Sequence, residues 1–551
     1  MTSEAGMTRR TMPVTMQARV TLEEDGCSQV LQMEELSFEE QLTIQSQVDD
    51  EFDGLCSSVP EARLFGQIFS QLMSSILAFR EAVGVTLQTG RHGEVCAFGC
   101  PTKEGGEARS EEEIRSWAWG RALSDFRVDE RRPLGALEFP PPTGRFVERC
   151  MTASLKVRSL LLRMRRILRE RIRNRGAPVR LLVVSGPGKA WFFERYGVPN
   201  ARCTFMTPDI LNSRFGVVTH DTQQPVRLDD GSDADCVEHF VSSLVAENAE
   251  DIEQALAQIL SSYDAILTCS EDEPLVRRVL ECFSTSGKQA WIFPEGAMVM
   301  NDAYWPFYRM FHYSPQGVHR LVFCEQERNF WSRADRTPSK VETIGYFADT
   351  TSGTRFDDIL VRLWWLLHRG KNPMAPRRKP VLVSFEVLED SGMTRLGLPS
   401  ESEMLDVMDS AIASLVESGR YVIAKCRSDL VAGLAQNRYR HLPVFVTSKM
   451  PWQSLARLAG GVIARESSLT FEAQYLGLRA VVWNPTHLRG RAEGLLQEFP
   501  GSVVVARTGT QLVNATTEMA SPQWGREVQK RTKADLRRRL LEWSSELDQS
   551  A

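Results

Sequence analysis

The chain has 551 residues, of which 42% are hydrophobic and 25% are charged, a composition typical of globular proteins. This length suggests about two to four domains rather than a single hydrophobic core. The formal net charge of −5 gives no support for a protein that binds nucleic acid over its whole surface, so we expect no nucleic-acid partner.

The first 177 residues divide into a tail and a mainly helical region. Residues 1–30 are polar and show little periodicity, so we expect them to be a disordered tail. Residues 31–177 show no catalytic pattern. Their clearest element is a helix at about 62–83, in which apolar residues recur every four positions: Leu64, Ile68, Leu72 and Ile76.

The cysteines favour a reducing compartment. There are 11 of them, an odd number, and none are spaced as a CxxC pair. His92, Cys96 and Cys100 come nearest to a metal pattern, but no obvious fourth ligand is near and the surrounding glycines oppose a helix, so we expect no metal there. The N-terminus lacks the apolar stretch of a signal peptide, and no segment reaches the roughly 18 apolar residues of a membrane span. We therefore expect a cytoplasmic protein.

Residues 152–174 are predicted to form a helix that ends near Gly176. An apolar stripe runs along it at helical spacing, and nine basic residues between Lys156 and Arg175 accompany a single acid, Glu170. The plainer interpretation is that the stripe packs on the N-terminal region while water solvates the arginines. The alternative is that the helix lies on an anionic membrane, which makes the protein peripheral at the inner face of that membrane.

From residue 178 onwards, strand and helix patterns alternate. Short apolar runs predict buried parallel strands, and amphipathic segments between them predict helices. In residues 178–347 we expect strands at 179–185, 264–269, 290–293, 320–324 and 341–346, and helices at 252–260 and 275–283. Residues 348–377 break the rhythm and indicate a linker that carries a helix at about 359–367.

The alternation restarts in residues 378–510. Strands are expected at 380–387, 421–424, 444–447, 462–464 and 480–483, with helices at 404–418, 452–458 and 469–476. Within 511–551 we expect a last helix at about 524–547. This pattern predicts an α/β protein with two Rossmann-like domains, in addition to the mainly helical N-terminal region.

One segment of the second domain, 461–484, suggests a phosphate site. A strand ends there, Ser467 and Ser468 turn the chain, and a helix begins. The first amides of a helix lack intrahelical partners, and with the helix dipole they attract an anion. Glu472, one turn further on, is placed to accept hydrogen bonds from ribose hydroxyls. An ordinary N-cap followed by a first-turn glutamate is the plainer interpretation, and it stays open.

This segment resembles the donor-binding motif of glycosyltransferases with the GT-B fold. The matching residues are Glu466-Ser467-Ser468, Glu472-Ala473 and Leu476-Gly477. The most similar families are bacterial surface-polysaccharide transferases of Kdo and glycerophosphate type, and the UDP-GlcNAc 2-epimerases. Upstream, 421–427 resembles the strand that delivers a basic residue to the donor, while 341–346 and Glu295-Gly296 resemble the end of a GT-B N-terminal domain. The similarity covers about residues 179–510.

The resemblance implies a glycosyltransferase that moves a sugar from a nucleotide-activated donor to a polysaccharide or glycolipid acceptor bound between the domains. The nucleotide sugar is then a substrate, and we expect no cofactor and no metal. Lys425 and Arg427 would neutralise the leaving diphosphate. The expected donor-binding residues are Lys425, Arg427, Glu466, Ser467, Ser468, Glu472 and His487.

Transfer with inversion requires a base that takes the proton of the acceptor hydroxyl. Glu295, directly after a predicted strand, is our first candidate, Asp302 the second and His312 the third. A loop carboxylate with a structural hydrogen bond is the plainer interpretation of Glu295. Gly186 and Gly188 lack the full pattern of a nucleotide P-loop, so we expect them in a loop that faces the cleft.

Two other functions are compatible with the sequence. One is a sugar-nucleotide 2-epimerase, which works on the donor alone and needs no acceptor. The other is a non-catalytic, glycosyltransferase-like partner protein, which would bind nucleotide weakly or not at all.

Overall fold

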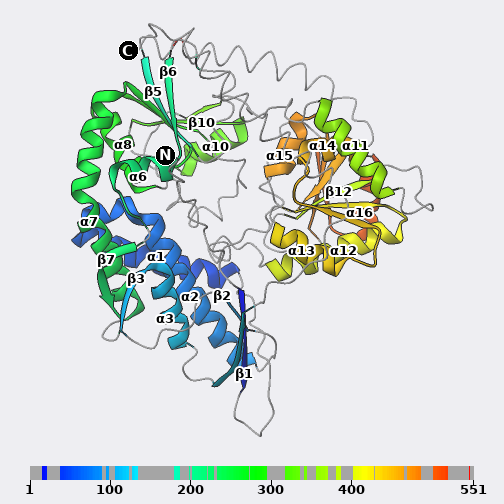
Figure 1. The fold of residues 1–551 in the computed structure, drawn as a ribbon, viewed down its shortest axis with the longest axis horizontal. Coiled ribbons are helices and arrows are strands. Elements are labelled where there is room, and N and C mark those ends of the chain that lie inside the picture. The colour runs from blue at the N-terminus through cyan, green and yellow to red at the C-terminus, as the bar shows by residue number, and fades with distance from the viewer. Residues whose placement is uncertain are drawn as a thin grey trace, which may run out of the picture. The chain divides into compact units, whose positions relative to one another are not determined.

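We describe a computed structural model of the chain, whose elements are labelled in Figure 1. The residues that the structure describes are 15–21, 38–89, 95–98, 106–122, 127–133, 179–185, 198, 201–219, 221–228, 232–271, 273–293, 317–334, 341–343, 355–369, 380–385, 401–426, 429–464, 468–484, 501–518 and 545.

Helices dominate the first of two compact units, which combines Met1–Glu138 with Val218–Ala249 and Asp390–Leu398. In α1 and α2, apolar residues at helical spacing are buried, and the rings of Phe52 and Phe69 lie 5.2 Å apart. Asp233, which begins α7 and is 2% exposed, is held by the Arg80 guanidinium at 2.7 Å. The helices of this unit are α1 (Phe38–Ser58), η1 (Pro60–Phe65), α2 (Gly66–Thr89), α3 (Glu111–Ala122) and the first part of α7 (Asp233–Ser262).

The first unit also contains strands that the sequence pattern did not predict. β1 (Thr15–Thr21) pairs antiparallel with β2 (Val95–Phe98) and β4 (Arg127–Pro133), and β3 (Glu107–Ser110) pairs with β7 (Asp221–Arg227). β1 lies within residues 1–30, so the expectation of a disordered tail does not hold for Thr15–Thr21. The partners of these strands lie far along the chain, so no turn signal between neighbouring strands marks them.

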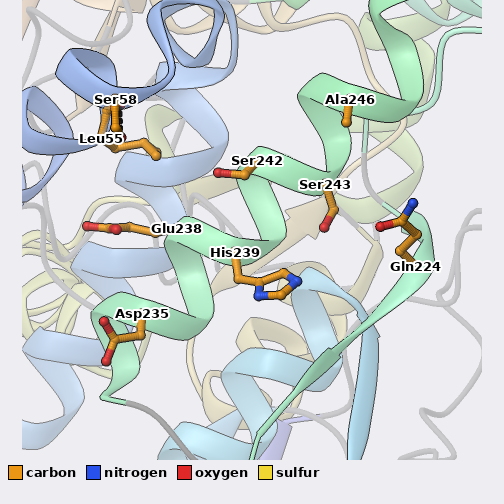
Figure 2. Close-up of a pocket in the computed structure, with 9 residues that line it drawn as sticks. All are labelled: Leu55, Ser58, Gln224, Asp235, Glu238, His239, Ser242, Ser243 and Ala246. Carbon is orange, nitrogen blue, oxygen red and sulfur yellow. Dashed lines mark hydrogen bonds between the residues drawn. The ribbon is translucent and has the colours of Figure 1, made fainter.

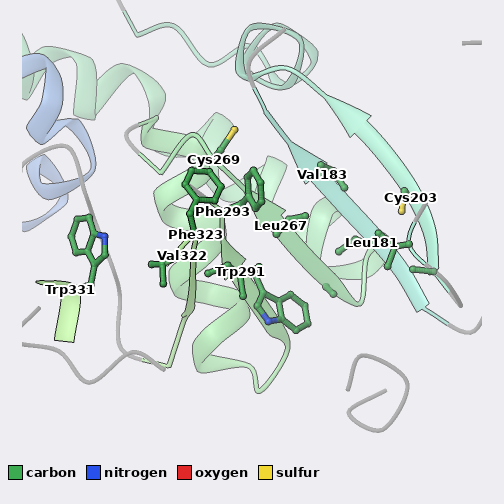
Figure 3. Close-up of a cluster of buried hydrophobic side chains, with 14 of the residues drawn as sticks. Leu181, Val183, Cys203, Leu267, Cys269, Trp291, Phe293, Val322, Phe323 and Trp331 are labelled. Atoms are coloured by element: carbon green, nitrogen blue, oxygen red, sulfur yellow. The ribbon is translucent and has the colours of Figure 1, made fainter. Parts of the chain in front are cut away.

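The first α/β sheet belongs to the second unit and has six parallel strands in the order β11-β10-β9-β8-β5-β6. Its central strands are continuous apolar runs because helices cover both faces of such a sheet. Figure 3 shows the core that they form, with Leu181, Leu267 and Trp291 among its buried side chains. The strands are β5 (Val179–Val184), β6 (Ala201–Met206), β8 (Ala265–Thr268), β9 (Gln289–Ile292), β10 (His319–Val322) and β11 (Val341–Thr343). The helices around it are α6 (Pro208–Phe215), α8 (Pro274–Thr285), α10 (Glu325–Ala334) and the rest of α7.

The second α/β sheet also has six parallel strands, in the order β14-β13-β12-β15-β16-β17. They are β12 (Val381–Phe385), β13 (Val422–Cys426), β14 (Val444–Thr447), β15 (Gly461–Ala464), β16 (Arg479–Trp483) and β17 (Val503–Ala506).

Helices cover both faces of this second sheet, as Figure 1 shows. α11 (Arg355–Arg369), α14 (Trp452–Ala459) and α15 (Ser468–Tyr475) pack on one face, which we call the α15 face. α12 (Glu401–Glu417), α13 (Asp429–Arg438) and α16 (Gly509–Glu518) pack on the other, which we call the α12 face. Since side chains alternate along a strand, the residues of each core cluster fix which face every strand residue points to.

The two predicted parallel sheets are confirmed, and every strand expected from residue 178 onwards is present. The pattern missed β6 and β17, and it found only the second half of α7. Trp364 and Trp365 of α11 lie in the core of the second sheet, so part of the expected linker belongs to that layer. Residues 218–249, expected in the first α/β domain, belong to the helical unit.

Two expected helices, at 152–174 and about 524–547, lie outside the described residues except for Ser545. Among the helices that the structure describes, none combines the length and the apolar character that a membrane crossing requires.

Candidate functional site

The start of α15 lies at the carboxyl edge of the second sheet. β15 ends at Ala464, and α15 begins at Ser468 and returns toward the amino ends of the strands. At its far end, Gly477 adopts a φ of 70°, a left-handed conformation that glycine tolerates and that lets the chain leave the helix for β16. The start of α15, where the helix dipole is positive, therefore lies at the edge where α/β sheets bind their ligands.

A buried hydrogen bond fixes α15 on the sheet. The Ser502 hydroxyl, just before β17, donates to Gln474 Oε1 at 2.7 Å, and Gln474 Nε2 donates to the Thr470 carbonyl at 3.4 Å. Gln474 and Ser502 are both fully buried. The sequence alone does not predict this pair, because its importance depends on which strand lies beside the helix.

Polar residues line the carboxyl edge of the second sheet on the α15 face. Ser384 of β12 pairs in register with Lys425 of β13, which pairs with Thr447 of β14. Leu382, Ile423 and Phe445, two residues earlier in each strand, belong to the core of the α15 face, so the three polar side chains point to that face too. Ser384 and Thr447 are buried and Lys425 is half-buried.

Lys425 places a positive charge at this edge. Its ammonium donates to the carbonyl of Cys426 at 2.8 Å and to that of Ser448 at 2.6 Å. Both acceptors are neutral, so the charge itself is not cancelled by them. β12 alone separates β13 from β15 in the sheet, which puts their ends roughly 10 Å apart at two strand spacings.

The neighbouring thiol of Cys426 takes no part in such chemistry. Burial raises the pKa of Cys426 to about 12, although the charge of Lys425 acts in the opposite direction. The thiol therefore stays protonated at neutral pH, and a protonated thiol is a poor nucleophile.

Of the predicted site residues, the structure describes Lys425, Ser468 and Glu472. It brings Lys425 and Ser468 to one edge and one face of the same sheet, and it places Glu472, half-buried, one helical turn beyond Ser468. The other predicted residues lie outside the described part of the chain: Gly186, Gly188, Glu295, Asp302, His312, Arg427, Glu466, Ser467 and His487.

The carboxyl edge of the first sheet contains a buried ion pair. Arg320 Nη1 lies 3.2 Å from Glu271 Oε1, and both side chains are less than 10% exposed. The carbonyl of Glu271 also accepts a hydrogen bond from Arg277 Nε at 2.9 Å. The Arg320 guanidinium lies 4.1 Å from the centre of the Trp331 ring, a distance at which a cation–π contact stabilises both groups.

A second buried carboxyl group caps the start of α10. Glu327 Oε2 accepts a hydrogen bond from the Phe323 amide at 2.7 Å. Burial raises the pKa of Glu327 from its ordinary value of 4.5 to about 7, while the Phe323 amide, Arg320 and Trp331 favour the charged form. This carboxyl group therefore changes its charge near neutral pH.

A hollow of about 460 Å³ lies within the first unit. Figure 2 shows its lining side chains, which come from α1, β7 and α7 and include Asp235, Glu238 and His239. Burial raises the pKa of Glu238, with further contributions from Glu51 and Asp235. None of the residues that the sequence analysis singled out lines it.

No protein-family profile matches the chain, and no curated protein sequence is similar to it. Among solved structures, it is similar to the spinosyn rhamnosyltransferase SpnG, solved with thymidine diphosphate (12% identity, 65% of this chain and 96% of that chain, TM-score 0.35). It is also similar to UDP-GlcNAc 2-epimerase from Methanocaldococcus jannaschii, solved with UDP-GlcNAc and UDP (12% identity, 64% and 99%, TM-score 0.36). A third is the wall teichoic acid polymerase TagF (12% identity, 71% and 92%, TM-score 0.31).

The structure itself contains two six-stranded parallel sheets with helices, as the sequence predicted.

Proposed function

We propose that the protein is a glycosyltransferase that moves a sugar from a nucleotide-activated donor to an acceptor, with the donor diphosphate bound at the start of α15. The observation that carries the proposal is the placement of the Lys425 ammonium and the first residue of α15, Ser468, at one edge and on one face of a single parallel sheet. Open α/β sheets bind their ligands at this edge.

The two groups complement a diphosphate. The dipole at the start of a helix stabilises an anion by roughly 0.3–2 kcal/mol, and each hydrogen bond to a charged group adds about 1.5–3 kcal/mol. The ammonium of Lys425, held in place by two carbonyl groups, counters the charge that the leaving diphosphate gains. In this arrangement Glu472 binds the ribose, and the proposal needs no metal.

Transfer with inversion requires one proton acceptor. The Glu295 carboxylate takes the proton of the acceptor hydroxyl, whose oxygen then bonds to the anomeric carbon of the sugar. The bond from that carbon to the diphosphate oxygen breaks, and the diphosphate leaves with the bonding electrons. Asp302 and His312 are the next candidates for this base. All three follow β9 in the sequence.

The acceptor is a carbohydrate or a lipid-linked carbohydrate in a cytoplasmic setting. Binding of the basic helix predicted at 152–174 to an anionic membrane would favour a lipid-linked acceptor. Sedimentation with anionic vesicles at low and high salt tests this, with a variant that carries glutamate at Arg165, Arg166 and Arg169 as its control. If the native chain stays in the supernatant at low salt, a soluble acceptor is the better choice.

One incubation separates the transferase from its alternatives. The protein is mixed with a panel of nucleotide sugars, with and without carbohydrate acceptors, and the products are separated by chromatography. A transferase releases nucleoside diphosphate and does so faster with an acceptor. An epimerase yields an isomerised nucleotide sugar without any acceptor, and a non-catalytic partner protein yields neither product.

A further inference from the structure

A buried asparagine stands at the carboxyl edge of the second sheet with an unused hydrogen-bond acceptor. Asn484 follows the last residue of β16 and is 2% exposed. Its backbone amide donates to the Ala506 carbonyl at 3.0 Å, which continues the pairing with β17 and fixes the direction of the side chain. Within the described part of the chain, Asn484 Oδ1 is buried and accepts no hydrogen bond.

The alternation of side chains places Asn484 on the α15 face. Val481 and Trp483 lie in the core of the α12 face, while Ala480 lies in the core of the α15 face. Asn484 is an even number of residues after Ala480 in the strand direction, so its side chain points to the same face, the one that α15 covers. It lies two residues beyond Val482, which pairs in register with Ala464 at the end of β15. Both Asn484 and the start of α15 therefore lie at the same edge and on the same face.

An unused buried acceptor is unfavourable in a protein without its ligand. A buried polar atom that lacks a partner loses its hydrogen bonds to water and gains none in return, so native proteins keep few such atoms. A comparison with Asn248 makes the point, since that residue is also 2% exposed. The Asn248 side chain accepts from the Val218 amide and donates to the carbonyls of Val218 and Leu244.

We propose that Asn484 Oδ1 accepts a hydrogen bond from a hydroxyl group of the donor, on its ribose or on its transferred sugar, while the diphosphate lies at the start of α15. The proposal rests on the proposed function and adds a specificity residue to the same site. The diphosphate of a nucleotide sugar has no proton to donate to this oxygen at neutral pH, whereas a hydroxyl has one. The site then distinguishes a nucleotide from a bare diphosphate.

The test is calorimetry with the full chain and its Asn484→Ala and Asn484→Leu variants, because leucine keeps the shape of asparagine but has no acceptor. The probes are pyrophosphate, the nucleoside diphosphates UDP, CDP, ADP, GDP and dTDP, and their common sugar derivatives. Both variants should bind the preferred nucleotide ligand about tenfold more weakly, the usual effect of losing one hydrogen bond, and bind pyrophosphate like the native protein. If the variants already bind the nucleoside diphosphate more weakly, the hydrogen bond is to the ribose. If only the nucleotide sugar binds more weakly, the hydrogen bond is to the transferred sugar.

Thermal unfolding without ligand separates this role from a structural one. Asn484→Ala should leave the melting temperature unchanged or raise it, because an unsatisfied group is removed. The matched control Asn248→Ala should lower the melting temperature and leave nucleotide affinity unchanged. Native nucleotide affinity in both Asn484 variants, an equal loss of pyrophosphate binding, or a drop in melting temperature like that of Asn248→Ala overturns the role of Asn484. If the native chain itself binds none of the nucleotides, the proposed function fails with it.

Discussion

The carboxyl edges of the two parallel sheets differ in how they treat polar groups. At the first edge, Glu271 and Arg320 are buried against each other, so the charges stabilise the protein itself. At the carboxyl edge of the second sheet, the polar residues on the α15 face are neutral or carry a single charge. The side-chain oxygen of Asn484 there accepts no hydrogen bond within the described part of the chain. The carboxyl edge of a parallel sheet thus has two uses in this protein. In the first sheet it holds a structural ion pair, and in the second sheet it carries polar groups that suit a ligand.

Breaking the ion pair should have the largest effect. Glu271→Ala leaves Arg320 buried without its carboxylate, so the free energy of unfolding should fall by about 3–5 kcal/mol. Urea denaturation followed by circular dichroism measures it. The control is Glu253→Ala, which removes the partially exposed pair with Arg278 and should cost less than about 1 kcal/mol. Equal effects of the two substitutions would contradict a buried, structural pair at the first edge.

Protonation of Glu327, beside the first sheet, should make the stability of the protein depend on pH. Its pKa is raised on folding, so the folded state holds the proton more tightly and this contribution to stability is lost as the pH rises from about 4.5 to about 7. The loss is on the order of 3 kcal/mol. Glu327→Gln keeps an acceptor for the Phe323 amide without a charge, so its stability at pH 8 should exceed that of the native protein. Melting temperatures measured from pH 5 to pH 8 check this, and parallel curves for the two proteins would refute it.

Glu295→Gln should separate chemistry from binding. Loss of a general base lowers the transfer rate by about 100-fold or more, and the donor should still bind with native affinity. Steady-state rates and calorimetry on the same preparation give both quantities. Full activity in this variant would move the role of base to Asp302 or His312.

Lys425→Met should act on binding at the second edge. Loss of the ammonium should weaken binding of a nucleoside diphosphate by about 10- to 100-fold, as expected for one hydrogen bond to a charged group. The matched control is Lys288→Met, because the Lys288 ammonium also donates to two carbonyl groups, those of Leu260 and Tyr263, but beside the first sheet. If both variants lose affinity equally, the effect comes from weakened folding and not from a lost contact with the ligand.

The sequence predicted the interior of both sheets because buried parallel strands are continuous apolar runs. It missed β6 and β17, which lie at the edges of their sheets and are only partly buried. It also missed the sheet of β1, β2 and β4, whose strands pair across long stretches of chain. Local patterns therefore identified the central strands of both sheets, whereas of the four edge strands they identified β11 and β14 and missed β6 and β17.

The candidate site likewise has one part that local sequence patterns predict and another part that they do not. The start of α15 was predictable from Ser467-Ser468, since helix starts have local signals. The roles of Asn484 and of the Gln474–Ser502 pair depend on register and on the face of the sheet, which a single segment does not encode. The one available signal was a polar residue that ends an apolar strand, as Asn484 does after Trp483.

The most direct test of the central claim is a calorimetric titration of nucleoside diphosphates into the native chain and Ser468→Trp. A bulky side chain at the first residue of α15 should abolish binding while the melting temperature stays unchanged. Ser410→Trp, at an exposed position on α12, is the control and should bind like the native protein. Binding by the native chain and the control, with none in Ser468→Trp, is the predicted result. Equal affinity in all three proteins would contradict the placement of the donor diphosphate at α15.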